Sequence, residues 1–199
     1  MTSGDNQQET ARIKLEPSWI VGFVDGEGCF SVSLHKNERY AVRSFGWQIN
    51  PTFHLYQHDR HRDVLEAVRQ HFGVGRIVAK GPGSSVLTYS VQRRIDVAQV
   101  IIPFFEQHRL LVKARDFEAF AEVVAGLSRG EHFTKSGFER LVRLAYSMNE
   151  HGKQRARRIE EILNGSSETV RQARGSLTVD VGKSQSEPHG DMRSQAEMT

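Results

Sequence analysis

A short apolar segment that ends in acidic residues set between glycines is the feature that most constrains this chain. Residues 18–24 are largely apolar, and Asp25-Gly26-Glu27-Gly28 follows them directly. Ser18 is a residue type that caps the start of helices, and glycines end them, so we predict a helix that starts at Ser18 and stops within the acidic run. The helix end then carries two carboxylates that an ordinary core does not require.

The segments after this helix alternate between apolar and polar residues with the period of a half-buried strand. We predict strands over 29–35 and 45–57, joined by a polar turn, with Pro51 favouring an edge or a bend in the second strand. Polar side chains then share one face of both strands. The residues expected to face the core are Phe30, Val32, Leu34, Phe45, Trp47, Ile49, Phe53 and Leu55.

The rest of the pattern predicts two more strands and four helices. Apolar residues at helical spacing after Asp59 predict a helix that Asp59 caps, and a glycine- and proline-containing loop at 81–85 predicts a hairpin. The element order is α–β–β–α–β–β–α–α–α, which is an α+β fold. The expected ranges are helix 59–72, strands 75–80 and 86–92, and helices 95–105, 113–127 and 136–148.

Length and composition predict one folded domain between two polar tails. We expect an N-terminal arm over 1–17, a domain over 18–163 and a disordered polar tail over 164–199. The sequence contains no signal peptide and no apolar run of membrane-spanning length, and its lone Cys29 suits a reducing compartment. We therefore expect an intracellular protein of a bacterial cytoplasm or an organelle, neither secreted nor bound to a membrane.

The charge distribution favours a polyanion as partner. Residues 18–164 carry 21 basic and 16 acidic side chains, whereas both flanking segments are slightly acidic. An unspecialised basic surface is the alternative. Phosphate-binding loops, calcium loops, metal-ligand histidine spacings and nucleophilic Ser or Cys constellations are absent from the sequence.

The segment Ile20-Val-Gly-Phe-Val-Asp-Gly-Glu-Gly28 resembles the signature of the LAGLIDADG homing endonucleases, in their single-motif branch. The order of elements, the Phe72–Gly75 break and the segment 103–117 extend the resemblance over about residues 18–148. The resemblance implies a saddle-shaped antiparallel sheet with helices on one face (the αββαββα fold of the family). It also implies a homodimer whose motif helices pack side by side over double-stranded DNA.

Small residues on the motif helix agree with that interface. Ser18, Gly22 and Gly26 are four residues apart, so they lie on one helical face and would let a second backbone approach closely. Packing of Gly22 against a helix of its own chain is the alternative. Asp25 is expected to cap the N-terminus of the partner's motif helix, or else to be a surface carboxylate.

The resemblance also implies the catalytic groups. Glu27 falls on the metal-binding carboxylate and Gly26 on the residue that offers its carbonyl oxygen, with Mg²⁺ as the expected cofactor. Lys113 falls on the active-site lysine and Gln57 on a glutamine that positions water. An arginine expected in the next helix falls on His61, which leaves that role in doubt.

The polar face of the sheet is the expected DNA-reading surface, although exposed sheet faces are polar in most proteins. Arginines such as Arg140 and Arg143 are further candidates for phosphate contacts. The expected activity is hydrolysis of both DNA strands, leaving 3′ overhangs. The alternative is a protein of the same fold that binds nucleic acid without cleaving it, such as an intron maturase or a regulator, and intron RNA stays open as a partner. The DNA-reading candidates are Ser31, Ser33, His35, Asn37, Gln48, Asn50, Thr52, His54, Arg76 and Lys80.

Overall fold

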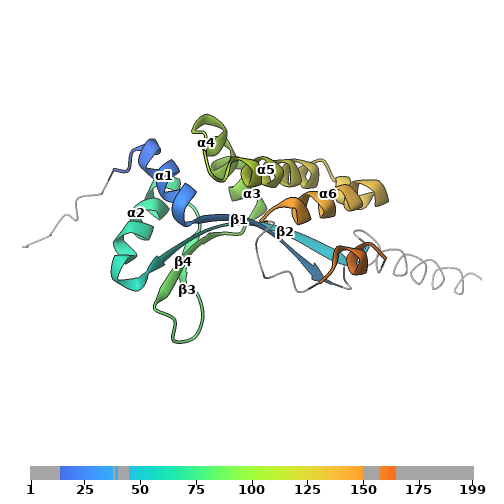
Figure 1. The fold of residues 1–199 in the computed structure, drawn as a ribbon, viewed down its shortest axis with the longest axis horizontal. Helices are drawn as coiled ribbons and strands as arrows, with labels where there is room; N and C mark the ends of the chain where they lie inside the picture. The colour runs from blue at the N-terminus through green and yellow to red at the C-terminus, as the bar shows by residue number, and fades with distance from the viewer. Residues whose placement is uncertain (1–13, 38, 40–44, 150–156, 165–199) are drawn as a thin grey trace, which may run out of the picture.

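A four-stranded antiparallel sheet carries helices on one of its faces (Figure 1). The computed structural model describes residues 14–37, 39, 45–149 and 157–164, so most of the predicted arm and tail lies outside the described residues. The strands are β1 (Gly28–Lys36), β2 (Trp47–His58), β3 (Arg76–Ala79) and β4 (Val86–Val91), in the order β1-β2-β4-β3. The predicted α+β fold is confirmed.

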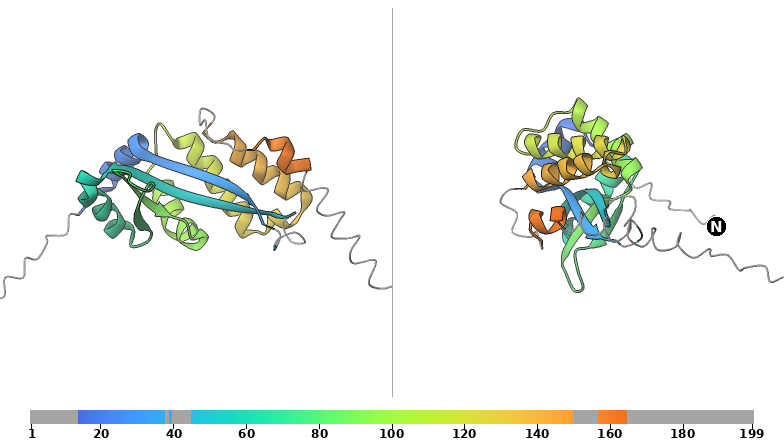
Figure 2. Two further views of the ribbon diagram at one scale, coloured as in Figure 1. Left: turned by 90° about the horizontal axis from the view of Figure 1, so that it is seen from below. Right: turned by 90° about the vertical axis from the view of Figure 1, so that its right-hand side faces the viewer.

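Two long strands form the axis of the sheet (Figure 2). β1 pairs with β2 over its full length, from Gly28 opposite Leu55 to Lys36 opposite Trp47. β4 pairs only with the second half of β2, from Phe53 onward. Pro51 therefore lies where β2 has a neighbour on one side alone, which is the edge position that a residue without a backbone N–H requires.

The second strand starts two residues later than predicted. Phe45 and Gly46 both adopt the left-handed backbone conformation, with φ of 56° and 77°. These angles belong to a turn and break the extended geometry, so Trp47 is the first residue of β2. Phe45 still packs inward, with its ring 5.3 Å from that of Phe138.

The helices lie close to their predicted positions. The first predicted helix after the sheet's second strand begins as the 3-10 turn η2 (Asp59–His61), and His58 rather than Asp59 caps it by accepting from the Arg60 N–H. The predicted helix over 95–105 consists of three consecutive helical pieces with π-helical geometry in the middle. None of the helices in the described ranges is long and apolar enough to cross a membrane. Their bounds are α1 Pro17–Glu27, α2 Arg62–Phe72, α3 Arg94–Asp96, η3 Val97–Ile101, α4 Ile102–Gln107, α5 Ala114–Ser128, η4 Glu131–Phe133 and α6 Lys135–Ser147.

An aromatic cluster fixes the helical layer on the sheet. The ring of Phe30 in β1 lies 5.3 Å from those of both Phe117 and Phe120 in α5, and 5.2 Å from Phe53 in β2. Rings at this spacing contribute packing energy beyond their buried area. Because β1 directly follows α1 in the chain, the cluster also sets the start of α5 beside the end of α1.

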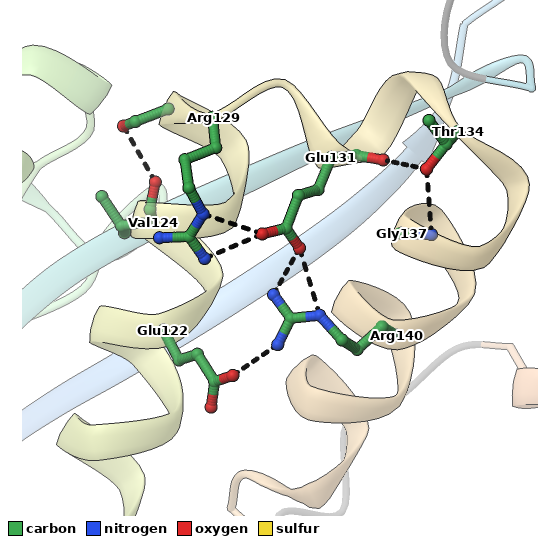
Figure 3. Close-up of polar contacts among 8 residues, drawn as sticks. Glu122, Val124, Arg129, Glu131, Thr134, Gly137 and Arg140 are labelled. Carbon is green, nitrogen blue, oxygen red and sulfur yellow. Dashed lines mark hydrogen bonds and ion pairs between the residues drawn. The ribbon is translucent and has the colours of Figure 1, made fainter.

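Charged side chains tie the turn between α5 and α6 together (Figure 3). Glu131 accepts hydrogen bonds from both Arg129 and Arg140, and Arg140 also pairs with Glu122 in α5. These hydrogen bonds hold the pKa of the Glu131 carboxyl below its usual range. Arg140 was predicted to contact phosphate, but its guanidinium is committed to two glutamates of its own chain.

Candidate active site

The motif helix starts earlier than predicted and ends within the acidic run, as predicted. α1 starts at Pro17 with Glu16 before it, so Ser18 is not the cap; proline suits the first helical position because the N–H it lacks has no partner there. The helix then continues through Asp25 to Glu27. The extended backbone of Gly28 ends the helix, and a Cβ at this position would lie 2.6 Å from the Val24 carbonyl oxygen.

No contact within the described part of the chain requires a glycine at the two other glycine positions of the motif. Gly22 and Gly26 are exposed, and a Cβ placed on either would meet no atom within 4 Å. Packing against a helix of the same chain, the alternative reading of Gly22, is therefore excluded among the described residues. With Ser18, these glycines give α1 a smooth outer face, opposite the buried Ile20 and Val24.

Asp25 links the motif helix to the start of α5. Its carboxylate accepts hydrogen bonds from the backbone N–H groups of Leu111, Val112 and Lys113, at 2.8, 3.1 and 3.0 Å. These residues directly precede the N-terminus of α5, where an anion is favoured. The sequence assigned this carboxylate to the partner's motif helix; the structure uses it instead to cap α5 of its own chain.

The side chain of Lys113 also links the start of α5 to the end of α1. Its ammonium donates to the backbone carbonyl oxygen of Asp25 at 2.7 Å, so the side chain lies at the C-terminal end of α1, where a cation complements the helix dipole. Glu27 lies two residues after Asp25 and is exposed. Its carboxylate makes no hydrogen bond or ion pair with any described residue. The predicted carboxylate and lysine thus lie at the same end of α1.

Gln57 and His61 extend this region along β2 and η2. Gln57 lies two residues beyond Leu55, the partner of Gly28, and its side-chain oxygen accepts from the His58 N–H at 2.9 Å. His61 is exposed at the end of η2. The neighbouring Arg62 is engaged with Glu66, whereas the exposed Arg60 on the other side has no side-chain partner among the described residues.

The predicted polar face exists, and the strand register aligns its members in rows. Cys29, His54, Ser90 and Arg76 are cross-strand partners in one row, and Ser31 pairs with Thr52 and Ser33 with Asn50. These side chains lie on the face opposite Phe30 and Phe53. Thr52 was predicted to contact DNA, but only 9% of its surface is exposed, which corrects that prediction. Together with Thr88 and Ser90, which are also buried, it forms a floor of small hydroxyl residues on this face.

Longer side chains stand around that floor. His54 contacts the Tyr56 hydroxyl through Nδ1 at 3.0 Å, and burial lowers its pKa, which favours the neutral imidazole. Its Nε2 is buried and has no hydrogen-bond partner among the described residues. Lys80 lies over the Tyr56 ring at 4.8 Å, and Arg76 donates to Gln92 at 3.1 Å.

At the far end of β1 and β2 the predicted DNA-reading side chains contact one another. Asn37 donates to the Gln48 side-chain oxygen at 3.3 Å, and His35 lies 3.1 Å from the Ser33 hydroxyl. Pairing of this kind orients amide and imidazole groups before any ligand arrives. Both Ser33 and His35 are exposed, and Gln48 and Asn50 are half-buried.

Comparison with known proteins identifies the family. The model of the LAGLIDADG endonuclease family matches residues 20–124, which include the motif helix, both long strands and Lys113. The chain belongs to the LAGLIDADG endonuclease family. The homing endonuclease I-ApeII of Aeropyrum pernix is 35% identical over 154 residues, covering 75% of this chain and 89% of that protein.

Solved structures agree with the family assignment. The archaeal intron-encoded homing endonuclease I-Vdi141I, in complex with DNA, matches with a TM-score of 0.70 and 30% identity over 77% of this chain and 95% of that one. I-SmaMI, bound to uncleaved DNA target in the presence of calcium ions, matches with a TM-score of 0.68 and 29% identity over 76% of this chain and 49% of that one. The chain spans less than a third of the two Neurospora crassa intron-encoded endonucleases that it also resembles.

Sequence reasoning missed two residues at the site. Leu111 and Val112 precede Lys113, their N–H groups bind Asp25, and their side chains are 83% and 78% exposed. Two adjacent aliphatic residues before the predicted active-site lysine were visible in the sequence. Nothing local marked them as exposed, because their contact with Asp25 spans more than 80 residues of chain.

Proposed function

We propose that this chain is a site-specific DNA endonuclease that acts as a homodimer and hydrolyses both strands of its target with a divalent metal, Mg²⁺ in the cell. The observation that carries the proposal is the exposed, unpartnered carboxylate of Glu27 at the end of a helix whose outer face is bare glycine. This carboxylate has no structural task within the described part of its own chain. Two-fold packing of α1 against a second α1 brings the two copies of Glu27 together.

The oxygen atoms at the end of α1 fit a hard divalent cation. Carboxylate and backbone carbonyl oxygens are the ligands that Mg²⁺ takes in proteins, and Glu27 and Gly26 supply one of each. Within the described residues no group of three or more His, Cys, Asp or Glu side chains could hold a metal ion. In this proposal the second copy of Glu27 supplies the further carboxylate. When bound, such a cation makes water a stronger nucleophile and neutralises a leaving oxyanion.

Lys113 and Gln57 supply the remaining chemistry in this proposal. The Lys113 ammonium is held at the end of α1 by the Asp25 carbonyl, and we assign it to stabilising the negative charge that develops on the scissile phosphate. The Gln57 amide nitrogen has no hydrogen-bond partner among the described residues and is available to orient a water molecule. We keep His61 out of the catalytic set because nothing in its surroundings directs it toward Glu27.

The polar face of the sheet is the proposed reader of base edges. Its amide, hydroxyl and imidazole groups suit hydrogen bonding in the major groove, where each good bidentate pair discriminates by roughly 1–3 kcal/mol. The matching structure of I-Vdi141I contains DNA, which supports this assignment. With twin carboxylates close to a two-fold axis, we propose cuts across the minor groove that leave 3′ overhangs.

Substitution of Glu27 tests the proposal. Glu27→Gln keeps the size of the side chain and removes its charge, so cleavage of target DNA in Mg²⁺ is expected to disappear while DNA affinity in a gel-shift assay stays close to that of the wild type. A cleavage-inactive binding protein, the alternative function, has no need of Glu27 or Lys113. Wild-type protein that binds DNA but never cuts it with Mg²⁺ or Mn²⁺ would favour that alternative.

A further inference from the structure

The most exposed large hydrophobic side chains of the described residues are adjacent in the chain. Leu111 is 83% and Val112 78% exposed, whereas the next, Phe133, is 54% exposed. Their loop is held in place, because Asp25 takes both of their backbone N–H groups as well as that of Lys113. A fixed loop that presents two aliphatic side chains to solvent marks an interaction surface.

This loop borders the smooth face of α1. At about 100° per residue, the side chain of Asp25 projects about 60° to one side of Gly22, and Trp19 projects about 60° to the other side. Trp19 is itself 43% exposed and stacks on Phe23 with ring centroids 5.0 Å apart. The exposed glycine strip therefore lies between the aliphatic loop on its Asp25 side and an aromatic pair on its other side.

We propose that Leu111 and Val112 form a lateral contact of the homodimer, packing against the partner copy beside its motif helix. This inference rests on the proposed homodimer and extends it to residues outside the motif. A second copy is the occupant because the pair is continuous with the glycine strip, and two aliphatic side chains cannot hydrogen-bond a phosphate or a base edge. The aligned part of I-SmaMI is about half of that chain, which leaves room there for a second unit of the same size.

The same contact couples assembly to catalysis. Lys113 follows Val112 directly, and one carboxylate binds the N–H groups of both residues. A partner seated on Leu111 and Val112 restricts the loop that carries the lysine. Because the dimer is two-fold symmetric, each copy gives and receives this contact, and every substitution acts twice.

A double substitution in the full-length chain tests the proposal. Leu111→Ser with Val112→Ser keeps both backbone N–H groups for Asp25 and removes the apolar side chains, so the melting temperature of the monomer is expected to stay unchanged. The dimer dissociation constant, measured by sedimentation over a dilution series, is expected to rise about 100-fold or more. Cleavage of target DNA is expected to fall at low protein concentration and to recover at high concentration.

The matched control is Ile95→Ser with Phe133→Ser. These side chains are also exposed, at 48% and 54%, but lie outside α1 and its loop, so the dimer dissociation constant should not change. An unchanged dissociation constant in the Leu111 and Val112 variant, or a wild-type chain that stays monomeric with and without DNA, overturns the inference. A wild-type dimer that the double substitution dissociates, but that never cuts DNA, supports the inference while refuting the proposed endonuclease.

Discussion

Replacing Gly22 with alanine is expected to strengthen the subunit and weaken the dimer at the same time. Gly22 lies in the middle of α1, and a Cβ there meets no atom within 4 Å in its own chain. Alanine is favoured over glycine by about 1 kcal/mol in a helix interior, so the free energy of unfolding of the subunit should rise by about that amount. For a chain of this length the melting temperature should rise by roughly 2–4 °C.

The dimer should respond in the opposite direction. Two added methyl groups enter the proposed helix crossing, and overpacking of a close contact typically costs about 1–3 kcal/mol. The dissociation constant should therefore rise about 10-fold or more, with loss of DNA cleavage at low protein concentration. Unfolding is measured well below the dissociation constant of the dimer, and assembly by sedimentation.

Gly28→Ala is the matched control within the same motif. A Cβ at Gly28 would lie 2.6 Å from the Val24 carbonyl oxygen and 2.7 Å from a Val24 methyl carbon, so this variant should lose subunit stability. The reasoning on Gly22 is refuted if Gly22→Ala destabilises the subunit, since the face would then be packed internally. It is equally refuted if the more stable variant dimerises and cuts DNA as the wild type does.

Two further predictions concern contacts that hold the site and the helical layer. Asp25→Ala leaves three N–H groups at the start of α5 without their acceptor, so we expect a lower melting temperature. The Lys113 ammonium keeps the backbone carbonyl of residue 25, but the carboxylate no longer holds the backbone of Lys113 at α1, so we expect a lower cleavage rate at full dimer occupancy. Arg140→Ala should lower the melting temperature without changing the salt dependence of DNA binding, since its guanidinium pairs with Glu122 and Glu131; a weaker salt dependence would restore it as a phosphate contact. The pKa of Glu131 is lowered by its arginine partners, so its stabilising effect is full above the ordinary carboxyl pKa and is lost as the pH falls through the lowered one. The difference in melting temperature between wild type and Glu131→Gln should accordingly shrink in acid, and a difference that stays constant to low pH would contradict the assignment.

The parts of the fold that were predictable depend on local periodicity. Alternation in β1 and β2 gave the correct inward and outward faces, because successive side chains of a strand point to opposite sides whatever surrounds them. Ser18 was assigned as a cap because its residue type outweighed Pro17, which starts the helix. The burial of Thr52 was not predictable, since it depends on neighbours in the sheet, such as Ser31 in β1, that only the register brings beside it.

The candidate site was predictable residue by residue but not as an arrangement. Glu27, Lys113 and Gln57 were placed by resemblance, and the structure adds that Asp25 holds Lys113 at the end of α1 that carries Glu27. That junction joins segments 86–88 residues apart, a separation at which sequence spacing carries no geometric information. Arg140 shows the same limit, because its glutamate partners on α5 and η4 are defined by helix packing.

A mixed dimer tests the central claim that two copies of Glu27 act in one cleavage event. Wild-type and Glu27→Gln chains with different tags are co-expressed, the heterodimer is isolated through both tags, and plasmid DNA carrying the target is cut under single-turnover conditions in Mg²⁺. The account predicts that the heterodimer loses double-strand cleavage although it binds the target as the wild-type homodimer does. Double-strand cleavage by the heterodimer at the wild-type rate would contradict it.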